Sequence, residues 1–109
     1  MTGSSGSSFS TYSSNDTSCD TLVLDTQLAS PKEDIIDNID VGDEMDVVVS
    51  VVNNLSTVQV LWQRHVAGGV ASPNIQRLLS CIEQGTIYTA RVTQKLGGQV
   101  KIRISPSRV

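Results

Sequence analysis

Apolar and polar residues alternate along five stretches of the chain, and this period of two predicts five β-strands. The five stretches are residues 22–28, 45–52, 57–62, 88–92 and 100–104. Asn53 and Asn54 stand between the second and third stretches, and asparagine tolerates the left-handed backbone of a hairpin turn. The sequence KLGG separates the last two stretches, so we expect hairpins at both places.

The spacing of apolar residues changes to a helical period after the third predicted strand. Four apolar residues recur there at positions 0, 3, 4 and 7, which is the spacing of one helix face. They are Ile75, Leu78, Leu79 and Ile82. Gly85 follows where a glycine commonly ends a helix. A shorter helical turn is predicted after the first strand, where Ser30, Pro31 and Glu33 match the sequence of a capping box.

These elements predict a mainly β protein with one α-helix, arranged as a small, half-open, five-stranded barrel. The helix is expected between the third and fourth strands, and the short helical turn after the first. Residues 20–105 form the single predicted domain. Residues 1–19 are rich in Ser, Gly and Thr and are predicted to be a disordered tail, and residues 106–109 a C-terminal tail. A domain of this size buries roughly 60–65% of its unfolded surface, so we expect any binding site on its outside.

Two glycines, Gly68 and Gly69, precede Ser72 and Pro73 at the start of the predicted helix. A Walker phosphate loop needs Lys and Ser/Thr after its last glycine, and a dinucleotide loop needs Gly-x-Gly-x-x-Gly; neither pattern is present. Pro73 also lacks an amide donor that an anion would use. We therefore interpret the glycines as a hinge that leads the third strand into a helix capped by Ser72.

Residues that carry catalysis or bind metals are sparse. His65 is the single histidine, no nucleophile motif surrounds it, and the run DNIDVGDEMD lacks the spacing of a calcium loop. We therefore expect no enzyme activity, no metal and no cofactor. Cys19 and Cys81 are too few and too unpatterned for a disulfide framework or a zinc site, so we expect two reduced thiols. No apolar run could span a membrane and no secretory leader is present, which predicts a cytoplasmic protein.

Charge is divided unevenly along the chain. Residues 1–56 contain ten acidic residues and Lys32, whereas residues 57–109 contain seven basic residues and Glu83, so a net charge of −9 precedes one of +6. Two interpretations remain open. The second half binds an anionic partner, or the two halves meet each other, within one chain or between chains.

The final hairpin concentrates positive charge on its outer face. Pairing Val92 with Ile102 keeps the apolar residues together and leaves a three-residue loop, 96–98. Arg91 then stands opposite Arg103. Like charges that meet across a ladder destabilise it unless a negative group neutralises them, so we expect this face to bind the partner.

Several further basic residues belong to the same candidate site. In the predicted register Thr93 stands opposite Lys101, and Lys95 lies at the turn. The candidate partner-binding residues are Arg64, His65, Arg77, Arg91, Lys95, Lys101 and Arg103.

The order of four motifs resembles a known family. VGDEMDVVV, VQVLW, GGVASPNIQRLLSCIEQG and YTARV follow one another within residues 41–104 and are similar to the HIRAN domain. The resemblance implies a half-open barrel, related to oligonucleotide-binding (OB) folds, that in the family captures single-stranded DNA, notably a 3′ end. The family's Asp-Pro-Asn-Ala stretch is replaced here by LSTV, and Trp62 and Tyr88 point inward by alternation, so no aromatic stacking platform is evident.

We therefore expect a non-catalytic binding module that uses the basic face of the C-terminal hairpin to bind nucleic acid, either single-stranded or as a DNA end. The alternative is a protein-interaction or homo-oligomeric assembly module in which acidic and basic halves pair. Neither function requires a membrane or a small-molecule cofactor.

Overall fold

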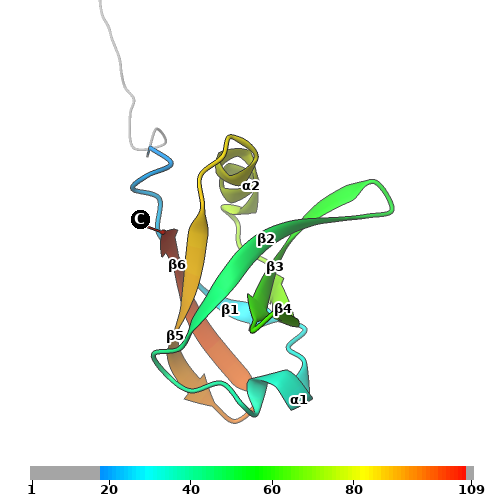
Figure 1. The fold of residues 1–109 in the computed structure, drawn as a ribbon, viewed down its shortest axis with the longest axis vertical. Coiled ribbons are helices and arrows are strands. Elements are labelled where there is room, and N and C mark those ends of the chain that lie inside the picture. Colours follow the sequence, from blue (N-terminus) through cyan, green and yellow to red (C-terminus); the bar gives the residue numbers. More distant parts are fainter. Residues whose placement is uncertain (1–17, 108–109) are drawn as a thin grey trace, which may run out of the picture.

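Alternating apolar residues give most of the strands one buried face, and six strands close into an antiparallel barrel. The computed structural model describes residues 18–107. Around the barrel the strand order is β1-β4-β3-β2-β5-β6 (Figure 1). The elements are β1 (Leu24–Ala29), α1 (Glu33–Ile36), β2 (Glu44–Val52), β3 (Leu55–Trp62), β4 (His65–Val70), α2 (Ile75–Glu83), β5 (Tyr88–Leu96) and β6 (Gln99–Pro106).

Strand β4 is the element that the sequence pattern did not predict. Gln63 and Arg64 have positive φ angles of 48° and 73° and reverse the chain directly after β3. β4 then pairs with β3 on one side and with β1 on the other. Because β6 also pairs with β1, the barrel is closed. The mainly β barrel is confirmed, whereas the prediction of five strands in a half-open arrangement is wrong.

Gly68 and Gly69 lie inside β4, so their interpretation as a hinge is wrong. A Cβ atom on Gly68 would stand 3.0 Å from the carbonyl oxygen of Ala29 and 3.3 Å from the side chain of Leu28. The absence of a side chain at Gly68 therefore lets β4 approach β1 closely enough to close the barrel. The same two glycines remove the alternation that would have marked β4 as a strand.

Alanine substitutions at the two glycines should have different effects on stability. Gly68→Ala should lower the free energy of unfolding by about 1–3 kcal/mol, because the new methyl group collides with backbone. Gly69→Ala is the matched control, since its Cβ would lie 3.6 Å from the nearest atom, and we expect a change within about 0.5 kcal/mol. Urea unfolding of the two variants measures the difference, and equal effects would contradict this account of β4.

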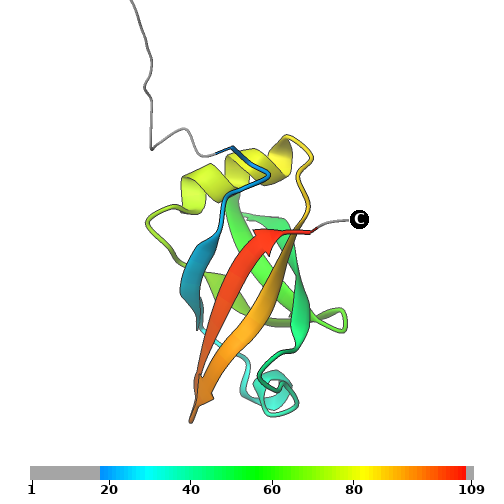
Figure 2. The same cartoon turned by 90° about the vertical axis from the view of Figure 1, so that its left-hand side faces the viewer.

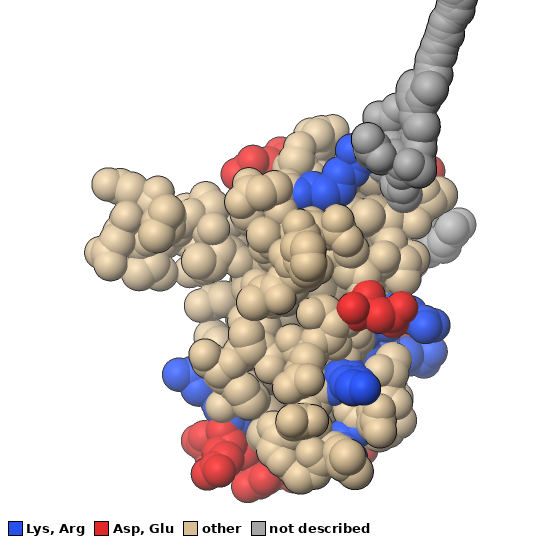
Figure 3. Space-filling view, turned by 180° about the vertical axis from the view of Figure 1, so that it is seen from behind, with Lys and Arg blue, Asp and Glu red and all other residues tan. Residues whose placement is uncertain are grey.

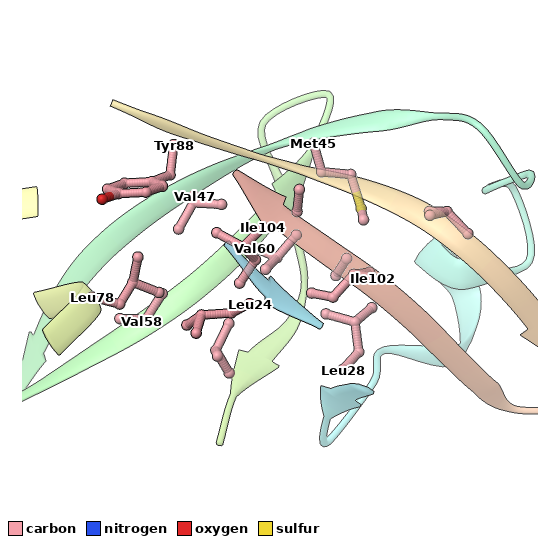
Figure 4. Packing of buried hydrophobic residues seen from close by; sticks show 14 of the residues in the cluster. Leu24, Leu28, Met45, Val47, Val58, Val60, Leu78, Tyr88, Ile102 and Ile104 are labelled. Atoms are coloured by element: carbon pink, nitrogen blue, oxygen red, sulfur yellow. The ribbon is translucent and has the colours of Figure 1, made fainter. Parts of the chain in front are cut away.

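The barrel interior is filled by side chains from all six strands and from α2 (Figure 4). Most apolar residues of the alternating stretches, and two of the predicted helix face, are buried. They are Leu22, Leu24, Leu28, Met45, Val47, Val58, Val60, Leu78, Leu79, Tyr88, Ala90, Val92, Val100, Ile102 and Ile104. No charged or polar residue of the described part is buried. The core is therefore apolar throughout, and any ligand must bind to the outer surface.

Both helices form where they were predicted, but neither begins with the expected cap. α2 ends at Glu83 with Gln84 as its C-cap, and Gly85 directly after it has a φ of +107°, which confirms the predicted glycine stop. Its N-cap is Asn74, without a side-chain cap bond, while Ser72 Oγ accepts a hydrogen bond from the Asn74 amide at 3.2 Å. In the first helix, Ser30 has a φ of +48° and Lys32 is the N-cap residue, so the predicted capping box does not form. Each Ser-Pro pair therefore lies in the turn before its helix.

A disulfide joins Cys19 to Cys81, and the prediction of two reduced thiols is wrong. The segment before β1 runs across α2 (Figure 2), which brings the two Cα atoms to 5.5 Å although the residues are 62 apart in sequence. The hydroxyl group of Tyr88 donates a hydrogen bond to the Cys19 carbonyl oxygen at 2.5 Å, and burial raises the pKa of this hydroxyl. The contact is thus fixed by one covalent bond and one hydrogen bond.

The hairpin of β2 and β3 extends beyond the barrel wall (Figure 1). Its turn residues, Asn53 and Asn54, have φ angles of 52° and 65°, which confirms the predicted hairpin turn. Val51 lies on the same strand face as the buried Val47 but is 66% exposed, because β2 has by then left the barrel. We call residues 47–58 the β2–β3 arm.

The chain termini lie mostly outside the described residues. Of the predicted N-terminal tail, residues 1–19, the structure describes Ser18 and Cys19, and of residues 106–109 it describes Pro106, the last residue of β6, and Ser107. The single domain and its tails stay predictions. Neither helix within residues 18–107 is long and apolar enough to cross a membrane.

Candidate functional site

The last hairpin adopts the predicted register over its first half. Val92 pairs with Ile102, and Arg91 therefore stands directly opposite Arg103. This register follows from burial, because shifting one strand by a single residue would turn its apolar side chains toward solvent. The structure thus confirms the pairing of two like charges that the sequence predicted.

The second half of the hairpin differs from the prediction. The ladder shifts between Val92 and Gln94, so that Lys101 pairs with Gln94 instead of Thr93. Thr93 Oγ1 donates a hydrogen bond to the Lys101 carbonyl oxygen at 3.2 Å, which holds this bulge in place. The bulge uses one extra residue and leaves a two-residue turn in place of the predicted loop 96–98. Gly97 supplies the positive φ, +61°, that this turn requires.

Two carboxylates flank the arginine pair. β1 places Asp25 beside Arg103, and β2 places Glu44 beside Arg91, so the four residues form one row across β1, β6, β5 and β2. Arg103 Nε donates to Asp25 Oδ1 at 2.8 Å, and this hydrogen bond, with the nearby negative charge, raises the pKa of Arg103. Arg91 Nη2 lies 3.9 Å from Glu44 Oε2. The row therefore has no net charge, because two carboxylates from the first half of the chain lie beside two arginines from the second half.

A surface groove of about 380 Å³ contains both arginines. Its other lining residues are Glu44, Thr89, Thr93, Ser105, Pro106 and Ser107. Four of these six have hydroxyl groups, which can donate to an anion or accept from a base. The two guanidinium groups can each bind an oxyanion through parallel N–H donors. Chemically, the groove is suited to a phosphate group or a carboxylate.

The remaining candidate residues serve other parts of the molecule. Lys95 Nζ donates to the Ile39 carbonyl oxygen at 2.9 Å and so joins β5 to the segment after α1. Arg64 forms the turn between β3 and β4, and His65 begins β4. Arg77 lies half-buried on α2, and its Nε atom is buried without a hydrogen-bond partner. None of these four residues lines the groove of Arg91 and Arg103.

Lys101 lies at the edge of the candidate site. It lies two residues before Arg103 on β6 and lines a second surface depression, of about 330 Å³, together with Asp25 and Thr93. Thr93 also lines the arginine groove, so the two depressions adjoin. Lys101 is exposed and can contact a ligand that extends beyond the groove.

Sequence reasoning did not identify Asp25 and Glu44 as part of the site. The alternating pattern shows which face each carboxylate occupies, but the pairing of β1 with β6 and of β2 with β5 depends on how the barrel closes. Figure 3 shows positive and negative side chains side by side on one side of the barrel, whereas the β2–β3 arm, at the left, shows none. The candidate site is therefore a charge-balanced groove and not a uniformly basic face.

The closed antiparallel barrel is compatible with an OB-like fold. No family model, curated protein or solved structure matches this chain, so the similarity to the HIRAN domain rests on the sequence motifs alone.

Proposed function

We propose that this protein is a non-catalytic, OB-like binding module and that single-stranded nucleic acid binds in the groove of Arg91 and Arg103. The pairing of these two arginines across β5 and β6, in a groove with four hydroxyl-bearing residues, is the observation that carries the proposal. Each phosphate group offers several oxygen acceptors, and guanidinium groups bind them in a bidentate manner.

The two arginines have different roles in this proposal. Asp25 holds Arg103 through Nε at 2.8 Å, so the remaining two guanidinium nitrogens are free to bind a phosphate in a fixed orientation. Arg91 is held loosely, since 3.9 Å separates it from Glu44 and both side chains are more than 60% exposed. An exposed ion pair contributes about 0–1 kcal/mol, so a phosphate group can replace the Glu44 carboxylate at little cost.

Substitutions in the groove should change oligonucleotide affinity in opposite directions. Replacing Arg91 and Arg103 together by glutamine should weaken binding and lower the logarithmic salt slope by roughly 1.4, the value for two lost phosphate contacts on a single strand. Glu44→Gln should strengthen binding by up to about fivefold, because it removes the competing carboxylate. Titration of a fluorescent single-stranded oligonucleotide at two salt concentrations measures both effects.

Arg64→Gln is the matched control for these groove variants, because Arg64 is an exposed arginine outside the groove. It should bind as the parent protein does, and circular dichroism should show all variants folded. Parent-like binding by the double arginine variant would contradict the proposal, and so would weaker binding by Glu44→Gln.

The alternative function, assembly through acidic and basic halves of different molecules, loses its main support. Asp25 pairs with Arg103 and Glu44 lies near Arg91 inside one chain, so these arginines do not need a second molecule to supply a carboxylate.

The cytoplasmic location expected from the sequence stays a prediction. Disulfides persist in oxidising compartments, while cytosolic reductants keep most thiols reduced. The bond between Cys19 and Cys81 therefore favours an oxidising compartment over the cytoplasm.

A further inference from the structure

One edge of β2 has no strand beside it over most of its length. β3 pairs with β2 from Asp46 to Val52, but β5 covers the opposite edge only from Glu44 to Asp46. Among residues 18–107, no strand pairs with that edge from Val47 to Val52. Unpaired backbone amides and carbonyls in such a row are a template for another strand.

The free edge lacks the features with which soluble proteins usually protect an exposed strand. No charged residue and no proline occurs between Val47 and Gln63. Three apolar side chains of the arm are largely exposed: Val51 at 66%, Val52 at 52% and Leu55 at 68%. Lysine, proline or a bulge would normally block such an edge. An uncharged partner strand fits this edge best, because charged side chains on the partner would stand beside apolar side chains with no counter-charge on the arm.

We propose that this edge pairs antiparallel with the same edge of a second copy of the protein, so that the two β2–β3 arms form one four-stranded sheet. The edge of a second copy is uncharged and β-branched in the same way, and a twofold axis makes identical edges complementary. The groove of Arg91 and Arg103 is lined by neither Val47 nor any later residue of β2, so the proposal does not depend on nucleic-acid binding.

The hairpin geometry selects one register for this pairing. With a two-residue turn, Val52 and Leu55 form the closing hydrogen-bonded pair, so the backbone groups of Val47, Val49 and Val51 point away from β3. Matching Val49 to Val49 of a second copy, and Val47 to Val51, joins all three outward-pointing residues. In any other symmetric register, at most two of these three residues form hydrogen-bonded pairs with the second copy. The remaining residue would face a position that pairs with β5 or lies in the hairpin turn.

The oligomeric state tests the proposal. Light scattering and sedimentation over roughly 1 µM to 1 mM should show the full-length parent protein at twice its 11.7 kDa chain mass. Val51→Pro should be monomeric throughout, because proline removes a backbone donor that faces the second copy and none that faces β3. A parent protein that stays monomeric over this range would overturn the proposal, and so would a Val51→Pro variant that still dimerises.

Two further variants separate strand pairing from loss of folding and from nonspecific hydrophobic contact. Val51→Lys keeps the backbone donor but places a charge at the edge; it should also be monomeric, with a parent-like circular dichroism spectrum, and a dimer here would contradict the proposal. Leu55→Lys is the matched control, because Leu55 is equally exposed but lies on β3. It should dimerise as the parent does, and its loss of dimerisation would indicate a hydrophobic patch instead of β2 pairing.

Cysteine cross-linking tests the register. Matching Val49 to itself places Val48 opposite Ser50 of the second copy in a non-hydrogen-bonded pair, where Cα atoms lie about 4.5 Å apart, within disulfide range. A mixture of Val48→Cys and Ser50→Cys proteins should therefore form cross-linked dimers several-fold faster than either variant alone. Equal rates in the mixture and in the separate variants would exclude this register.

Discussion

Replacing Cys19 by serine should lower the free energy of unfolding by about 4 kcal/mol, because the bond to Cys81 joins residues 62 apart. In the chain-entropy account, a cross-link over a loop of this length restricts the unfolded chain strongly and the folded chain little. Cys19 is the better position for the substitution, since it is half-buried, whereas Cys81 is buried on α2 and a serine hydroxyl there would lack solvent. Urea unfolding under oxidising conditions measures the loss.

A reducing agent provides the control for this substitution. Dithiothreitol should destabilise the parent protein by a similar amount and leave Cys19→Ser unchanged, because the variant has no bond to break. If the variant unfolds at the same urea concentration as the oxidised parent, the disulfide does not contribute to the fold.

The second large effect is expected at Leu78, the central buried residue of α2. Leu78→Ala should lower the free energy of unfolding by about 3 kcal/mol, within the 2–5 kcal/mol that such truncations usually remove. Leu78 is 0% exposed and lies beside Val58 (Figure 4), and α2 contacts β2 and β3 near the start of the arm (Figure 1). The truncation would leave a cavity beneath α2. Because the disulfide at Cys81 holds the helix in place, α2 cannot move inward to fill this cavity.

Gln76→Ala is the matched control for Leu78→Ala, since Gln76 is exposed on the same helix. Its effect should stay within about 0.5 kcal/mol by thermal or urea unfolding. A loss below about 1 kcal/mol for Leu78→Ala would show that α2 does not close the core as described.

The alternation of apolar residues was sufficient to predict most of the core and the register of the last hairpin. Val92 and Ile102 pair as expected because a shift by one residue would expose every apolar side chain of a strand. The same signal failed for β4, since two of its six residues are Gly68 and Gly69, and glycine has no side chain to alternate.

The candidate site was predicted only in part, because its composition depends on contacts between distant segments. Arg91 and Arg103 belong to neighbouring strands of one hairpin, and local pairing was enough to bring them together. Asp25 reaches Arg103 through the pairing of the first strand with the last, which no local pattern reveals. The disulfide could not be predicted for the same reason, because Cys19 and Cys81 belong to distant segments that only the folded barrel brings together.

The position of β6 in the barrel has a consequence for synthesis on the ribosome. β6 lies between β1 and β5, so the barrel is completed by the strand that is translated after the other five. Until Gln99 and the residues after it have left the exit tunnel, β1 has no partner on this side, and the apolar faces of the nascent strands remain open to water and to chaperones. The barrel can therefore close only after all six strands have been translated, and not while the earlier strands are being translated.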